Sequence, residues 1–144
     1  MGFGEIPERI GCGVTIGIVV AMPEEVATLT QVKLNKGDLF RLNDAITLGC
    51  SGAGRVNAAN AAAKLIENGA SRLISWGCAA GLNPQCRPGD LVLAAYCQTM
   101  SGDKLATDSV WRDLLKSVLP MSVNCHEGIL VEATDLIAES HAKA

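Results

Sequence analysis

The residues best placed to bind a ligand lie in a stretch with almost no bulky side chains, GCAAG at positions 77–81. An apolar run from Leu73 to Trp76, typical of a short strand, ends directly before it. Main-chain N–H groups in so bare a segment are open to close approach, and open α/β sheets bind ligands at loops after the carboxyl ends of strands. The pattern predicts a substrate site here, with a plain connection between two strands as the alternative.

A tight turn after this segment is predicted to lead into a second strand. Residues 87–90 read RPGD, in which proline presets the second position of a turn and Gly89 suits the positive φ of the third. We expect a type II turn that leads into an apolar strand at 91–95.

A carboxylate stands near another strand end. The β-branched run VTIGIVVA at 14–21 is typical of a strand buried on both faces, and Pro23, Glu24 and Glu25 are typical of the helical turn that follows. The helix macrodipole favours both glutamates at that place without any function. Glu25 lies one turn into the helix and close to the strand end, so it is the candidate to face a ligand.

A glycine turn, SGAGRVN, follows a further predicted strand and begins a predicted helix. Gly52 and Gly54 resemble the start of a dinucleotide fingerprint, but Asn57 takes the place of its third glycine. The pattern still supports a helix N-terminus that offers N–H groups to an anion, with Arg55 as an added charge. An ordinary strand-to-helix turn with a solvated arginine is the alternative.

The composition narrows the classes of protein. Of 144 residues, 49% are hydrophobic and only 3% aromatic, which suits helices packed closely on a sheet better than an aromatic stacking platform. The net charge of −3 comes without a basic stripe, so nucleic acid and anionic membranes are poor partners. No apolar run is long enough to span a bilayer, and we expect a cytoplasmic protein. The six cysteines lack metal-ligand spacing, so no zinc site is expected and free thiols are favoured over disulfides.

Strand and helix patterns alternate along the chain after a leader at 1–13, which is expected to be mobile. The alternation predicts a single α/β domain at 14–144, with a mainly parallel or mixed twisted sheet flanked by helices. Strands are predicted at 14–21, 38–43, 45–50, 73–76, 91–95 and 123–131, the last interrupted at 125–128, and helices from Pro23, at 56–68, from the cap Asp108 to Leu119, and at 134–144.

Three blocks of sequence, in this order, resemble one family. They are GIVVAMPEE at 17–25, SGAGRVNAA at 51–59, and GCAAGL at 77–82 followed by PGD at 88–90. This set resembles the superfamily of nucleoside phosphorylases and methylthioadenosine/S-adenosylhomocysteine nucleosidases, and the rest of the chain is similar to the hopanoid-associated phosphorylases of bacteria. The resemblance implies a phosphorylase/hydrolase-like three-layer fold. It also implies cleavage of the N-glycosidic bond of an adenosine-type nucleoside by phosphate or water, with no metal and no cofactor.

The same resemblance assigns roles to individual residues. Glu25 matches the glutamate that positions the attacking water in the nucleosidases, and its charge would also stabilise a positively charged sugar. Cys78 falls where the family usually has serine or threonine, which are stronger hydrogen-bond partners. The implied substrate-binding positions are Ala21, Met22, Cys78, Ala79, Ala80 and Gly81, and the implied phosphate or anion positions are Gly52, Gly54 and Arg55.

The chain departs from the family at its C-terminal end. Family members continue into strands that carry a methionine-glutamate pair for the ribose hydroxyls and an aspartate for the purine leaving group, so this part of the fold is expected to be missing. The unpaired sheet edge that would result favours a homodimer. A catalytically incomplete fragment or remnant of that fold, acting as a binding or structural protein, is the alternative function. A Rossmann-type nucleotide-binding module and a redox role for the cysteines rank behind both.

Overall fold

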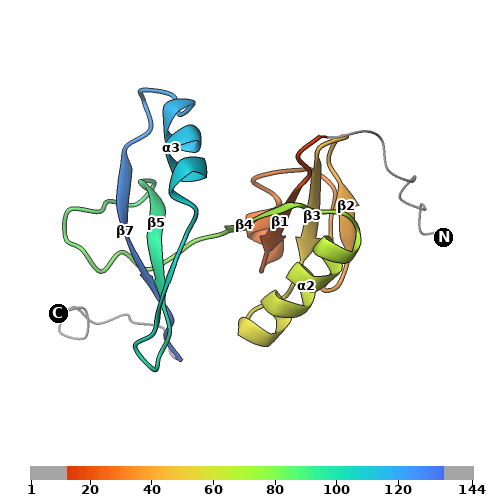
Figure 1. Ribbon diagram of the computed structural model, residues 1–144, viewed down its shortest axis with the longest axis horizontal. Coiled ribbons are helices and arrows are strands. Elements are labelled where there is room, and N and C mark those ends of the chain that lie inside the picture. Colours follow the sequence, from red (N-terminus) through yellow and green to blue (C-terminus); the bar gives the residue numbers. More distant parts are fainter. Residues whose placement is uncertain (1–12, 135–144) are drawn as a thin grey trace. The chain divides into compact units, whose positions relative to one another are not determined.

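The structure is a computed structural model that describes residues 13–134 (Figure 1). The leader expected at 1–13 and the last helix expected at 134–144 lie outside this range, apart from one residue of each. The chain divides into two compact units, Met1–Cys78 and Ala79–Ala144. The assignment of residues 14–144 to a single domain stays a prediction. Within the described range no helix is both long enough and apolar enough to cross a bilayer.

A four-stranded sheet forms the first unit. Its strands are, in spatial order, β2 (Leu39–Arg41), β3 (Ile46–Cys50), β1 (Ile16–Val20) and β4 (Arg72–Trp76). β1 is parallel to both of its neighbours, and Val20 lies opposite Cys50 on one side and Trp76 on the other. The three parallel strands therefore end level with one another, and the residues that follow them leave the sheet at the same edge.

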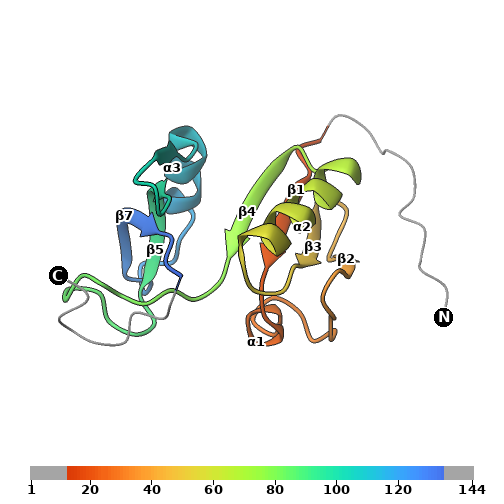
Figure 2. The ribbon, with the colours of Figure 1, turned by 90° about the horizontal axis from the view of Figure 1, so that it is seen from below.

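Helices cover both faces of this sheet. α1 (Pro23–Val26) follows β1, and α2 (Arg55–Glu67) lies alongside the strands in Figures 1 and 2. Val26 belongs to a hydrophobic cluster with Val20, whereas Ala61 and Leu65 of α2 cluster with Val19. Successive side chains of a strand point to opposite faces, so α1 and α2 pack on opposite sides of the sheet.

The second unit is built on a three-stranded sheet. Its central strand, β5 (Leu91–Gln98), pairs antiparallel with β6 (Lys104–Ala106) and parallel with β7 (Cys125–Val131). α3 (Ser109–Ser117) begins at the predicted cap, because Oδ1 of Asp108 accepts the N–H of Trp111 at 2.8 Å. An ion pair of 3.1 Å between Lys116 and Glu127 links α3 to β7.

The predicted fold class is confirmed, since both sheets are mixed and helices flank them. One local prediction was wrong, and one strand was not predicted. β7 carries no interruption at 125–128, because its backbone pairs with β5 from Cys125 through Gly128, and this pairing outweighs the poor strand propensity of the residues there. β6 was not predicted, because three residues are too few to show an alternating pattern.

Asp90 ties the RPGD turn of the second unit to β7. The turn has the predicted form, with a φ of 94° at Gly89 and the N–H of Asp90 donated to the carbonyl of Arg87 at 3.0 Å. Oδ2 of Asp90 accepts the N–H of Arg87 at 2.9 Å and lies 2.8 Å from Nε2 of His126. The Arg87 N–H first, and His126 second, hold the pKa of Asp90 below its usual value. The sequence suggested no partner for His126, because 36 residues separate it from Asp90.

Asp90→Asn is expected to reduce the acid sensitivity of the second unit. A carboxyl group with a lower pKa in the folded than in the unfolded state stabilises the fold above its unfolded pKa of about 3.9, and this stabilisation is lost as the pH falls through the folded pKa. The wild-type unit should therefore lose stability below about pH 4, and the variant should lose less. Acid unfolding followed by the indole N–H signal of Trp111 measures the difference. Asp113→Asn, an exposed change on α3, is the control; equal curves for the two variants would contradict the prediction.

Candidate functional site

The candidate site lies at the edge where β1 and β4 end, and its central group is the carboxylate of Glu25. Glu25 is buried, with only 6% of the residue exposed. Its Oε2 accepts the N–H groups of Ala21 at 3.3 Å and Met22 at 3.1 Å, and its Oε1 accepts the N–H of Cys78 at 2.8 Å. Three main-chain donors from two strand ends therefore converge on one buried carboxylate.

The local sequence explains why Glu25 turns back to the strand end. Met22 has extended backbone angles of −122° and 151° and precedes a helix whose first residue is Pro23. The first N–H groups of a helix have no intrahelical acceptor, and a glutamate at the third helical position can reach back to the cap residue. Glu25 occupies that third position, so its carboxylate satisfies main-chain donors at the end of β1.

Gly77 leaves the space that the Glu25 carboxylate occupies. A Cβ at this position would lie 2.6 Å from Oε1 of Glu25 and 2.9 Å from its Cδ, both closer than real contacts. The bare segment was predicted to admit a ligand, and at its first residue it admits a side chain of the protein instead. The residues from Gly77 to Gly81 are all exposed, and the binding of a ligand by this segment stays a prediction.

The structure brings together four of the predicted site residues: Glu25, Ala21, Met22 and Cys78. Cys78 takes part through its main-chain N–H, and its thiol is free and exposed. The other predicted binding positions, Ala79, Ala80 and Gly81, belong to the second unit. Their part in the site stays a prediction.

The glycine turn leaves the sheet at the same edge, after β3. The N–H of Ser51 donates to the carbonyl of Val20 at 2.7 Å and so joins the ends of β3 and β1. Gly52 and Gly54 have φ angles of 76° and 98°, which glycine adopts without strain, and Gly54 precedes the first residue of α2, Arg55. A phosphate or anion site at Gly52, Gly54 and Arg55 stays a prediction.

No pattern in the sequence indicated that Lys36 lies near this turn. A Cβ at Gly52 would lie 3.0 Å from Cδ of Lys36, so the lysine stem packs against the glycine. Lys36 sits in the irregular segment before β2, where no periodicity indicates which way a side chain points.

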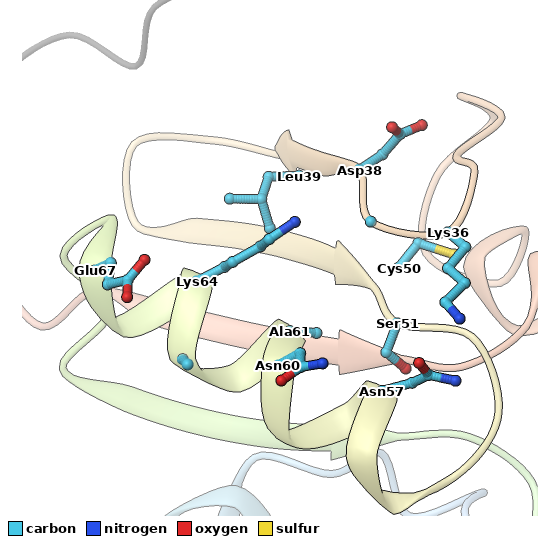
Figure 3. Close-up of a pocket in the computed structure, with 12 residues that line it drawn as sticks. Lys36, Asp38, Leu39, Cys50, Ser51, Asn57, Asn60, Ala61, Lys64 and Glu67 are labelled. Carbon is cyan, nitrogen blue, oxygen red and sulfur yellow. The ribbon is translucent and has the colours of Figure 1, made fainter.

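A hollow of about 430 Å³ lies between α2 and the segment around β2, and Glu25 is not among the residues that line it. Figure 3 shows Lys64 reaching from α2 toward Leu39, and Lys36 and Ser51 also line the hollow. The lining of the hollow also includes Asp38 and Glu67. Positive and negative side chains are therefore mixed, and the hollow favours neither an anionic nor a cationic ligand. Among the described residues no group of His, Cys, Asp and Glu could hold a metal ion.

A buried glutamate at the common end of parallel strands, next to a bare glycine segment, defines an α/β protein with a strand-end site. The family model described as the phosphorylase superfamily matches residues 15–143. The chain belongs to this superfamily. No curated protein sequence matches it.

Several solved structures share the fold. One is a mutant of Helicobacter pylori MTAN, the 5′-methylthioadenosine/S-adenosyl homocysteine nucleosidase, with 5′-methylthioadenosine in its active site. Its sequence is 18% identical and its TM-score is 0.74, and the match covers 92% of this chain and 70% of the Helicobacter pylori chain. S-adenosylhomocysteine nucleosidase from Streptococcus pyogenes, in complex with 5-methylthiotubericidin, is 21% identical with a TM-score of 0.69, over 90% and 67%. A futalosine hydrolase mutant of Helicobacter pylori strain 26695 is 17% identical with a TM-score of 0.69, over 90% and 72%.

Proposed function

We propose that the protein cleaves the N-glycosidic bond of an adenosine-type purine nucleoside, with Glu25 as the catalytic carboxylate. Membership of the phosphorylase superfamily supports this reaction class, and structures of the same fold carry 5′-methylthioadenosine or a related compound. The observation that carries the proposal is the position of Glu25, whose carboxylate is held at the end of β1 directly against the start of the bare segment.

The hydrogen bonds of Glu25 leave it able to act on a nucleophile or on the sugar. An ionised carboxylate has about four acceptor sites, and main-chain donors use three of them here. Oε1 accepts only one of these hydrogen bonds, so one acceptor site is left for a water molecule or a sugar hydroxyl. The negative charge would also stabilise the positive charge that develops on the sugar as the glycosidic bond breaks.

The proposal extends to the neighbouring residues. Ala21, Met22 and the segment from Cys78 through Ala79, Ala80 and Gly81 would contact the nucleoside, through main-chain groups where side chains are small. Gly52, Gly54 and Arg55 would hold phosphate if phosphate is the nucleophile, with the ammonium group of Lys36 as a further positive charge. We also propose a cytoplasmic homodimer that needs no cofactor. Among the residues that the structure describes, β4 is an end strand of the four-stranded sheet, which supports such an association.

The burial of Glu25 favours a second candidate function, in which this residue has a structural role. Glu25 is 6% exposed as a residue, and its carboxylate, which accepts three main-chain N–H groups, could serve purely to join two strand ends. The chain would then be a binding or structural protein on the same fold, without turnover. The two functions differ in whether a nucleoside is consumed.

Release of adenine from 5′-methylthioadenosine and from adenosine, each with and without phosphate, tests the proposal. We expect turnover of at least one of them, and dependence on phosphate would distinguish phosphorolysis from hydrolysis. Calorimetric titration with the same nucleosides separates the remaining outcomes. Saturable binding without adenine release would support the second function, and neither binding nor release would contradict both.

A further inference from the structure

α1 is too short to hold Glu25 in place by itself. It has four residues, whereas isolated helices shorter than about 12 residues are marginal even in favourable sequences. Val26 anchors it in the core with 1% exposure, and the Glu25 carboxylate is bound to the strand ends. At the carboxyl end of the helix the main-chain carbonyl of Glu25 accepts the N–H of Thr28 at 3.1 Å, so any further attachment of this carbonyl comes from side chains.

Two side chains supply that attachment. Nε1 of Trp76, the last residue of β4, lies 2.9 Å from Oγ1 of Thr28, and Oγ1 lies 2.7 Å from the main-chain carbonyl of Glu25. An indole N–H only donates, so the hydroxyl must accept from Trp76 and is free to donate its own proton to the carbonyl. The direction of both hydrogen bonds is therefore determined, and a hydroxyl that accepts and donates at once strengthens both.

The last residue of β4 and the segment directly after it are thus linked to Glu25 in two ways, one indirect and one direct. Trp76 reaches its main-chain carbonyl through Thr28, and Cys78, two residues later, donates its N–H to the carboxylate. Trp76 is 37% exposed, so its contribution is not burial alone, and the indole N–H sets it apart from other apolar residues at a strand end. We propose that Trp76 and Thr28 are positioning residues that keep the Glu25 carboxylate in its working orientation.

This inference rests on the proposed function for its catalytic consequence, but its structural part can be measured without activity. Trp76→Phe keeps an aromatic ring and removes the donor, Thr28→Val removes the hydroxyl at nearly the same size, and Thr28→Ser restores the hydroxyl. We expect Trp76→Phe and Thr28→Val each to lower kcat for adenine release, per folded molecule, by about 3- to 10-fold, with KM changed less than about twofold. The kcat of Thr28→Ser should stay close to the wild-type value. The double variant with Trp76→Phe and Thr28→Val should have a kcat no lower than that of the less active single variant.

Hydrogen exchange of main-chain and indole N–H groups supplies the readout that needs no turnover. The N–H of Cys78 and the indole N–H of Trp76 should exchange about 3- to 10-fold faster in Thr28→Val, while the indole N–H of Trp111 in the second unit serves as the internal reference. Faster exchange in a chain that releases no adenine would contradict the proposed function and leave the positioning role standing. Unchanged exchange and unchanged kcat in both variants, or an equal loss in Thr28→Ser, would overturn the positioning role.

Discussion

Glu25→Gln is expected to lower the rate of adenine release by about 10²- to 10⁴-fold, the range that a positioned acid or base contributes. The amide has no negative charge to stabilise a positive sugar and cannot take a proton from water. Steady-state rates with 5′-methylthioadenosine measure this loss. Glu24→Gln, one residue earlier on the same helix and exposed, is the matched control and should keep the wild-type rate.

The same substitution should also destabilise the first unit. The carboxylate accepts N–H groups with both oxygens, but glutamine offers one oxygen and one NH₂ group. Either Cys78 or the pair Ala21 and Met22 would then face another donor. Leaving hydrogen-bonding groups unmatched costs about 1–3 kcal/mol, which urea unfolding can resolve. A variant that retains both rate and stability would show that Glu25 neither acts on a substrate nor joins the strands.

The sequence allowed the strand-end edge to be predicted before the structure. Each strand pattern indicates where its strand ends, and the alternation of strands with helices predicted a mainly parallel or mixed sheet; in a parallel arrangement the residues directly after β1, β3 and β4 leave the sheet at one edge. Val20, Cys50 and Trp76 do end level, and Ser51 bonds back to Val20. Parallel strands follow from the order of strands and helices along the chain, and this order can be predicted from the sequence alone.

What fills the space at that edge could not be predicted in the same way. Gly77 shows only that a Cβ is absent, and the group that uses the room comes from a helix at a distant position in the chain. Trp76 belonged to an apolar run, yet its distinguishing contact is to Thr28, 48 residues away. Periodicity reports which face of an element is buried, whereas a hydrogen bond depends on where two elements meet in space.

The link between Asp90 and His126 was missed for a related reason. The turn type followed from local preferences of proline and glycine, and these preferences act within four residues. The histidine approaches only because β7 pairs with β5 in one particular register, with Val92 opposite His126. Register is decided by the whole strand pair, so no spacing in the chain indicated it.

Gly77→Ala is expected to displace the Glu25 carboxylate and to cost both stability and rate. The added Cβ would lie 2.6 Å from Oε1, and the carboxylate cannot move away freely because three main-chain N–H groups hold it. Forcing a methyl group into a filled site costs about 1–3 kcal/mol. A shift of the carboxylate by about 1 Å would lower the rate of adenine release by about 10²-fold.

The matched control for this change is Gly128→Ala in β7, where a Cβ would meet nothing within 4 Å. Neither glycine has a φ in the left-handed range, so alanine strains neither backbone and the difference between the two variants isolates the clash with Glu25. Urea unfolding should separate them, with Gly128→Ala near the wild-type midpoint and Gly77→Ala below it. Equal stability and equal rates for both would mean that the carboxylate does not rest against Gly77 in solution, and Glu25 would then lack the position on which its proposed role depends.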